Sequence, residues 1–196
     1  VVNTNGGLNL SGTGVLTLGG ATINNPFGQV ATDSGAHSFV FANGAVFNNA
    51  GTFFAQNDNG LLFSGGASTA FNNTNIFTRN VGTGTYTFDN GIAFNNSGTV
   101  NINSGVLALN GGGVSTGGIF NIASGATLRF NATYGFDAVT ALAGAGTIEF
   151  VSGAQVIRGS YNVTDPTSVN GGSVTVNNSV SIAPLAFRGS FVNIAP

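Results

Sequence analysis

Apolar and polar residues alternate in short segments along the whole chain, and most segments end at a glycine or an asparagine. In the stretch 94–113, Val100 and Ile102 alternate with asparagines, a Ser-Gly step follows, and Leu107 and Leu109 repeat the alternation. A period of two is typical of β-strands, and no segment shows a sustained helical period. The pattern therefore predicts an all-β protein built from strands of about four to six residues.

Two sequence motifs recur at intervals of 20–30 residues. An apolar residue followed by two asparagines begins at residues 23, 47, 71 and 94, and the pattern apolar-x-apolar-x-Ser-Gly begins at Val100, Phe120 and Ile148. Repeats of 20–30 residues indicate a solenoid, a propeller or an array, but a propeller blade needs about 40 residues and four strands. We therefore expect a parallel β-helix (β-solenoid) with coils of about 20–24 residues. About eight such coils would give a rod roughly 35–45 Å long.

The asparagine pairs have a physical role in such a stack. Parallel coils place identical side chains above one another, and a column of amides can hydrogen-bond along the axis. Asparagine also tolerates left-handed backbone at corners. The alternative is a flat polar face that binds a glycan or ice. The predicted ladder comprises Asn24, Asn25, Asn48, Asn49, Asn72, Asn73, Asn95 and Asn96, and the predicted interior column comprises Ile23, Phe47, Phe71 and Phe94.

Later parts of the chain give further expectations for the register. The Ala-rich segment 134–146 predicts a short irregular coil, and residues 180–182 predict a strand near the C-terminus. Arg129 and Glu149 occupy equivalent outward positions 20 residues apart. They are expected to form an exposed ion pair between neighbouring coils.

The composition narrows the possible functions. Only 5% of the 196 residues are charged, lysine is absent and the formal charge is −2. Nucleic-acid binding is not expected, because phosphate recognition needs clustered Lys and Arg. Cysteine is absent, which excludes disulfides and thiolate chemistry. No apolar run approaches the length of a membrane span, so membrane insertion is not expected. We interpret residues 1–196 as a single domain, and as a processed chain or a piece of a longer repeat protein, because it starts with Val1 inside repeat-like sequence.

Few residues are candidates for catalysis or metal binding. His37 is the only histidine, and its neighbours read as ordinary loop residues. Asp33 and Asp58 lie 25 residues apart, a spacing that would allow them to meet at one corner as a weak cation site, but solvated polar turns are the favoured interpretation. The remaining acids are scattered, whereas β-solenoid lyases and hydrolases need clustered carboxylates or a calcium site. We expect no enzymatic activity, no catalytic residue, no metal and no cofactor.

The run FNNTNIFTRNVGTGTYTFDNGIAFNNSGTVNINSGVLALNGGG, with the later GGIFNIASGATLRF, GAGTIEFVSGAQV and GSYNVT, resembles the repeats of large bacterial β-strand-repeat surface proteins. These proteins are akin to autotransporter passengers and filamentous-haemagglutinin-like adhesins. The resemblance covers about residues 45–180. It implies a right-handed β-solenoid that is secreted or attached to a bacterial surface, and it carries no catalytic residues.

Three hypotheses follow from the sequence. The first is a structural or adhesive rod whose partners are further repeats or other copies of itself, stacked end to end into a filament. The second is a module that binds surface glycans or ice. The third, a polysaccharide-degrading β-helix enzyme, is disfavoured by the low charge.

Overall fold

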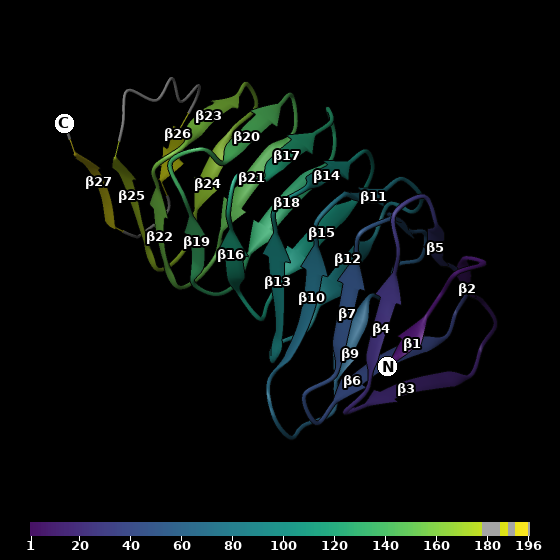
Figure 1. Ribbon diagram of the computed structural model, residues 1–196. Helices are drawn as coiled ribbons and strands as arrows, with labels where there is room; N and C mark the ends of the chain where they lie inside the picture. The colour runs from purple at the N-terminus through teal and green to yellow at the C-terminus, as the bar shows by residue number, and fades with distance from the viewer. Residues whose placement is uncertain (178–184, 188–190, 196) are drawn as a thin grey trace.

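The computed structural model of the chain describes residues 1–177, 185–187 and 191–195, with side chains described as far as residue 177. Over these residues the chain is all-β and winds into a parallel β-solenoid of about 8 turns. Figure 1 shows the strands of successive coils stacked side by side from the N-terminal to the C-terminal end. The fold class expected from the alternation and the repeats is confirmed. The strand expected at residues 180–182 lies outside the described residues.

Each coil contributes one strand to each of three parallel sheets. The ten-stranded sheet A contains β1 (Val2–Asn3), β4 (Thr22–Asn25), β7 (Val46–Asn49), β10 (Thr69–Asn73), β13 (Ile92–Asn96), β16 (Gly113–Ser115), β19 (Tyr134–Phe136), β22 (Ala154–Ile157), β25 (Ser173–Asn177) and β27 (Phe191–Ala195). The eight-stranded sheet B contains β2 (Leu8–Leu10), β5 (Val30–Asp33), β8 (Thr52–Ala55), β11 (Ile76–Arg79), β14 (Thr99–Ile102), β17 (Ile119–Ile122), β20 (Ala141–Gly144) and β23 (Ser160–Val163). The nine-stranded sheet C contains β3 (Val15–Gly19), β6 (Ser38–Ala42), β9 (Leu61–Phe63), β12 (Thr85–Phe88), β15 (Val106–Leu109), β18 (Thr127–Phe130), β21 (Thr147–Phe150), β24 (Thr167–Val169) and β26 (Leu185–Phe187).

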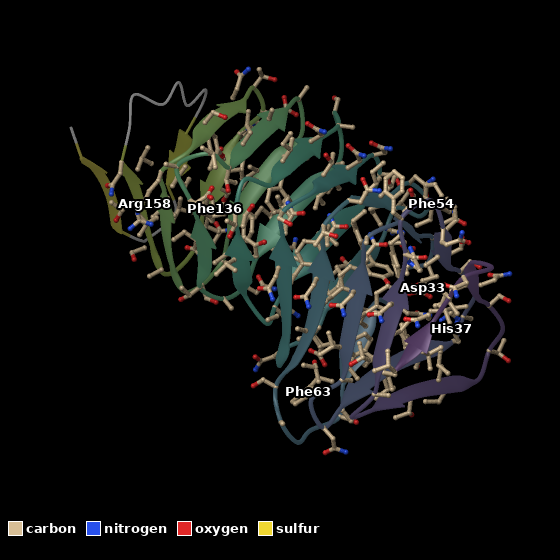
Figure 2. All side chains as sticks on the ribbon, in the orientation of Figure 1. Asp33, His37, Phe54, Phe63, Phe136 and Arg158 are labelled. Carbon is tan, nitrogen blue, oxygen red and sulfur yellow. The ribbon has the colours of Figure 1, made fainter. Side chains whose placement is uncertain are left out.

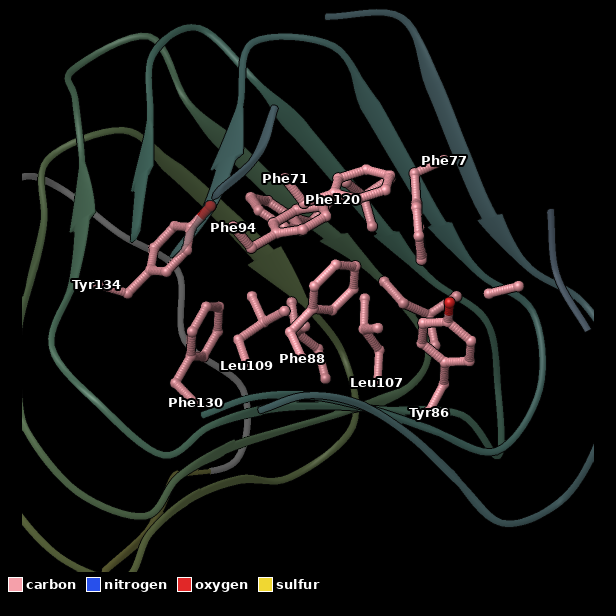
Figure 3. Packing of buried hydrophobic residues seen from close by; sticks show 14 of the residues in the cluster. Phe71, Phe77, Tyr86, Phe88, Phe94, Leu107, Leu109, Phe120, Phe130 and Tyr134 are labelled. Atoms are coloured by element: carbon pink, nitrogen blue, oxygen red, sulfur yellow. The ribbon is translucent and has the colours of Figure 1, made fainter. Parts of the chain in front are cut away.

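The interior is filled by side chains that stack from coil to coil. Ile23, Phe47, Phe71 and Phe94 follow one another in register in sheet A and are buried. The rings of Phe47 and Phe71 are stacked with centroids 5.0 Å apart, and those of Phe71 and Phe94 with centroids 5.7 Å apart. Figure 3 shows how rings from the three sheets meet in the middle of the coil. The parallel register explains the column, because equivalent inward positions lie one strand spacing apart.

Two local expectations are wrong. The segment 134–146 is a regular coil, because β19 and β20 pair in register with the preceding coil. Glycine and alanine on these strands fit the stack as well as larger residues do. The asparagine pairs lie within strands and not at left-handed corners. Among the described non-glycine residues only Asn43, with a φ of 53°, has the left-handed conformation, and it forms a corner with Gly44.

The ion pair expected between neighbouring coils is present. Arg129 and Glu149 face each other in the register of β18 and β21, and Arg129 Nε donates to Glu149 Oε2 at 2.5 Å. Both side chains keep part of their surface in solvent. We expect a double-mutant cycle with Arg129→Ala and Glu149→Ala to give a coupling of about 0–1 kcal/mol, because solvent screens such pairs. Denaturant unfolding measures it, and a coupling above about 2 kcal/mol would contradict this assignment.

Candidate functional site

The structure arranges the eight asparagines of the sequence motif in two columns at the end of the sheet A strands. The inner column is buried and contains Asn25, Asn49, Asn73 and Asn96. The Nδ2 of each of the first three donates to the Oδ1 of the asparagine in the next coil at 2.8 Å, whereas Asn96 Nδ2 has no partner among the described residues. The first three amides also donate to a backbone carbonyl of the next coil. Amide hydrogen bonds therefore connect four coils along the interior of the wall.

The outer column is half-exposed and runs in the opposite sense. Asn24, Asn48, Asn72 and Asn95 each donate from Nδ2 to the Oδ1 of the preceding coil, at 2.7–2.9 Å, starting from Asn3. Both columns end at β13, because the next strand presents Ser115 opposite Asn96. An amide that donates to the asparagine of one neighbouring coil and accepts from that of the other has little hydrogen-bonding capacity left for a ligand.

We expect Asn49→Ala to lower the free energy of unfolding by about 1–3 kcal/mol, because the Oδ1 of Asn73 and the carbonyl oxygen of Ile76 lose a buried donor. The matched substitution is Asn48→Ala in the outer column, where water can replace the lost bonds. It should cost less than about 1 kcal/mol. Denaturant unfolding compares the two variants, and equal losses would show that burial does not set the strength of the ladder.

A second group of polar residues lies at the corner between sheets B and C, and all of its members except Asp58 are buried. The last inward position of successive sheet B strands is Leu10, Asp33, Ala55, Arg79 and Ile102 in register. Two charged residues thus replace apolar ones in an interior column. We call the group the polar cluster, and it comprises Asp33, His37, Asn57, Asp58, Arg79 and Tyr86.

Asp33 is the centre of the polar cluster. Its Oδ2 accepts from the Tyr86 hydroxyl at 2.6 Å, and its Oδ1 accepts from Asn57 Nδ2 at 2.8 Å. His37 Nε2 also lies 2.8 Å from Oδ1. Burial raises the pKa of Asp33, and these partners only partly oppose that shift. Burial, followed by the neighbouring Asp33, raises the pKa of Tyr86 well above its ordinary value. Tyr86 therefore remains a hydrogen-bond donor at neutral pH.

Arg79 forms the other half of the polar cluster and is fully buried. Its Nη1 donates to the carbonyl oxygen of Asn57 at 2.7 Å, and its Nη2 is paired with Asp58 Oδ1. The guanidinium carbon lies 5.9 Å from the centre of the Tyr86 ring. Gly82 leaves room for the Asp58 carboxylate, with which a Cβ at this position would collide. Nη1 also donates to the carbonyl oxygen of Ala55 at 3.4 Å, so the guanidinium is shared between one carboxylate, two carbonyls and one aromatic face.

The structure corrects the interpretation of Asp33 as a solvated turn residue. Asp33 and Asp58 do lie at one corner on adjacent coils, but Asp33 is buried, whereas Asp58 is exposed and paired with Arg79. His37 is likewise buried at 4% exposure. The described residues contain no group of three or more His, Cys, Asp or Glu side chains that could hold a metal ion. Most polar groups of the cluster are partners of one another.

Outside the polar cluster, Asp137 is a carboxylate held by several donors. Its oxygens accept from the Thr140 hydroxyl at 2.7 Å and from the backbone N–H of Thr140, Val139 and Gly117. The Thr140 hydroxyl lowers the pKa of Asp137 below its ordinary value; desolvation, the next largest cause, opposes the shift, and the backbone donors add to the lowering. Asp137 thus fixes the loop between β19 and β20.

The lowered pKa of Asp137 predicts a pH dependence. A carboxyl group whose pKa is lower in the folded state stabilises the fold above its unfolded-state pKa, and this contribution is lost as the pH falls through the folded-state pKa. We expect Asp137→Asn to be destabilised at pH 6 and to approach wild type as the solution is acidified below that folded-state pKa. Unfolding curves of both proteins across this range measure the difference. A pH-independent difference would contradict the assignment.

Comparisons with known proteins identify no relative of this chain. No protein-family model, no curated protein and no solved structure matches the chain. No helix among the described residues is long and apolar enough to cross a membrane.

Proposed function

We propose that the chain is a non-catalytic structural or adhesive β-solenoid that forms part of an extracellular rod or filament. The observation that carries the proposal is the continuous stacking of coils through three sheets, two amide columns and a phenylalanine column. A structure repeated along one axis supplies length and stiffness. The buried carboxylate of Asp33 already contacts three side chains of the polar cluster. This supports a structural role for the cluster. In line with the resemblance of the repeats, we propose a secreted or bacterial cell-surface location and an adhesin-like role.

The sheet edges support end-to-end association as the mode of assembly. Among the described residues, β1, β2 and β3 each have a hydrogen-bonded neighbour on one side only. Such an edge is a template for another strand, from a further repeat or from a second copy of the chain. We propose that these are the partners of the chain.

The experiment is negative-stain electron microscopy of the native material, with light scattering on the same sample. We expect filaments whose axial repeat is close to the length of one chain. Val15→Lys places a charge on the edge strand β3 and should abolish them. Val139→Lys is the matched control, because Val139 is equally exposed at 72% but lies in a side loop. Dispersed rods in the wild type, or filaments that survive Val15→Lys, would contradict end-to-end stacking.

The outer face of sheet B favours glycan or surface binding as a second candidate function. One outward column reads Val30, Thr52, Ile76, Thr99 and Ile119 in register, with no charged residue in it. A flat, uncharged face suits an ordered, uncharged surface. Co-sedimentation with insoluble cellulose and chitin tests it. Ile76→Lys should release the chain from the solid, whereas Leu62→Lys on sheet C, at similar exposure, should not.

A further inference from the structure

A pocket of about 300 Å³ lies between β2 and β3, against the polar cluster. Its lining includes Asn9, Leu10, Ser11, Gly14, Leu16 and His37. Figure 2 shows His37 and Asp33 close to each other near this end of the solenoid. The pocket is formed by the first two coils together, since His37 belongs to the coil below the other lining residues.

The pocket owes its space to Gly14. Val15 pairs with Ser38, so the preceding residues Gly14 and His37 are stacked, and the Ser38 N–H donates to the Gly14 carbonyl. Counting back from the paired residues Phe39, Leu61 and Phe88 stacks His37, Asn59 and Tyr86; His37 and Tyr86 are buried in the interior, and Asn59 between them is exposed. Later coils fill this column with Leu107 and Leu128. At Gly14 no side chain covers the imidazole, and a Cβ there would meet no atom within 4 Å.

His37 brings an unused hydrogen-bonding atom to the pocket. The side chain is buried, with Nε2 at 2.8 Å from Asp33 Oδ1. Both ring nitrogens are buried: Nε2 faces the Asp33 carboxylate at ion-pair distance without hydrogen-bond geometry, and Nδ1 has no hydrogen-bond partner among the described residues. When Nε2 carries the proton that faces the carboxylate, Nδ1 of the neutral ring is an acceptor. A buried acceptor without a donor is costly, and a ligand that supplies an O–H removes that cost.

The other lining residues limit the class of ligand. Asn9 and Ser11 supply further donors and acceptors, Leu10 and Leu16 supply apolar surface, and no Asp, Glu, Lys or Arg lines the pocket. The volume is at the low end of small-molecule sites, which fits one ring and not an extended chain. We propose that this pocket binds a small uncharged ligand rich in hydroxyl groups, a monosaccharide or a polyol, with one ligand O–H donating to His37 Nδ1. This inference does not rest on the proposed filament role.

His37 is the only histidine, so its imidazole gives a single set of NMR signals that report directly on the pocket. The full chain is titrated with glucose, galactose, mannose, N-acetylglucosamine and glycerol, and in a second arm with the methyl glycosides and disaccharides of the same sugars. We expect a saturable shift of the His37 signals with at least one compound. Binding of free sugars alone would identify a free ligand, and binding of glycosides as well would identify the end of a glycan. The absence of a saturable shift in both arms would overturn the proposal.

Gly14→Leu closes the pocket with the residue type that later coils use, and should weaken binding at least tenfold. Gly19→Leu is the matched control at the end of β3, the strand that Gly14 precedes, because a Cβ at Gly19 also meets no atom within 4 Å and Gly19 lies outside the pocket lining. It should bind like wild type. Ser11→Ala provides a second test should Gly14→Leu not fold, with several-fold weaker binding expected. Unchanged binding in the folded Gly14→Leu variant, or in Ser11→Ala where Gly14→Leu does not fold, would also overturn the proposal.

Discussion

Phe71→Ala should lower the free energy of unfolding by about 3–5 kcal/mol, the largest effect of any single aromatic truncation in the chain. The Phe71 ring is fully buried and contacts rings from all three sheets. Its centroid lies 5.1 Å from that of Phe53 in sheet B and 5.2 Å from that of Phe88 in sheet C. Removing it opens a cavity that stacked coils cannot close, because each coil is fixed by hydrogen bonds to its neighbours.

Guanidinium unfolding followed by far-ultraviolet circular dichroism measures this loss. Phe71→Ile reproduces the residue that Ile23 supplies in the second coil and should cost less. Phe27→Ala is the control, because Phe27 is 83% exposed, and it should change stability by no more than about 0.5 kcal/mol. Comparable losses for Phe71→Ala and Phe27→Ala would contradict a close-packed interior at Phe71.

Asp33→Ala should also be strongly destabilising, by about 3–5 kcal/mol. The substitution leaves the Tyr86 hydroxyl and the Asn57 amide without their buried acceptor, and His37 Nε2 without the carboxylate oxygen that faces it. Asp33→Asn keeps one acceptor oxygen and should cost less. A double-mutant cycle of Asp33→Ala with Tyr86→Phe isolates the pair, and a coupling near zero would show that the hydroxyl and the carboxylate do not depend on each other.

The raised pKa of Asp33 gives this prediction a pH signature. A carboxyl group whose pKa is higher in the folded state contributes stability below its unfolded-state pKa, and loses it as the pH rises through the folded-state pKa. Asp33→Asn cannot titrate at this position. The stability of wild type relative to Asp33→Asn should therefore increase as the pH is lowered through that window. The opposite slope would mean that His37, Asn57 and Tyr86 outweigh burial at Asp33.

The repeated columns could be predicted from the sequence for a specific reason. An apolar residue followed by two asparagines returns at nearly constant intervals, and parallel coils turn a constant interval into vertical stacking. Phe47 and Asn49 therefore meet Phe71 and Asn73 in any solenoid with this coil length. The opposite direction of the two amide columns is not encoded in the motif. The buried column donates toward the next coil and the half-exposed column toward the preceding one.

The polar cluster could not be predicted in the same way. Asp33 and Tyr86 lie 53 residues apart, and the coil between Leu61 and Phe88 is longer than its neighbours, so a fixed interval does not align them. One signal was present in the sequence. The strands TVNI and IFNI end in an inward isoleucine, whereas VATD and IFTR place Asp33 and Arg79 in that position. A charged residue in an apolar slot of a repeat indicates a buried partner elsewhere in the stack.

X-ray diffraction from oriented native material tests the central claim, that coils stack along one axis to build a structural element. The account predicts a meridional reflection near 4.8 Å, because the strands lie across the axis of the solenoid and of any filament that continues it. A reflection at this spacing on the equator, or material that does not orient at all, would contradict the proposed assembly.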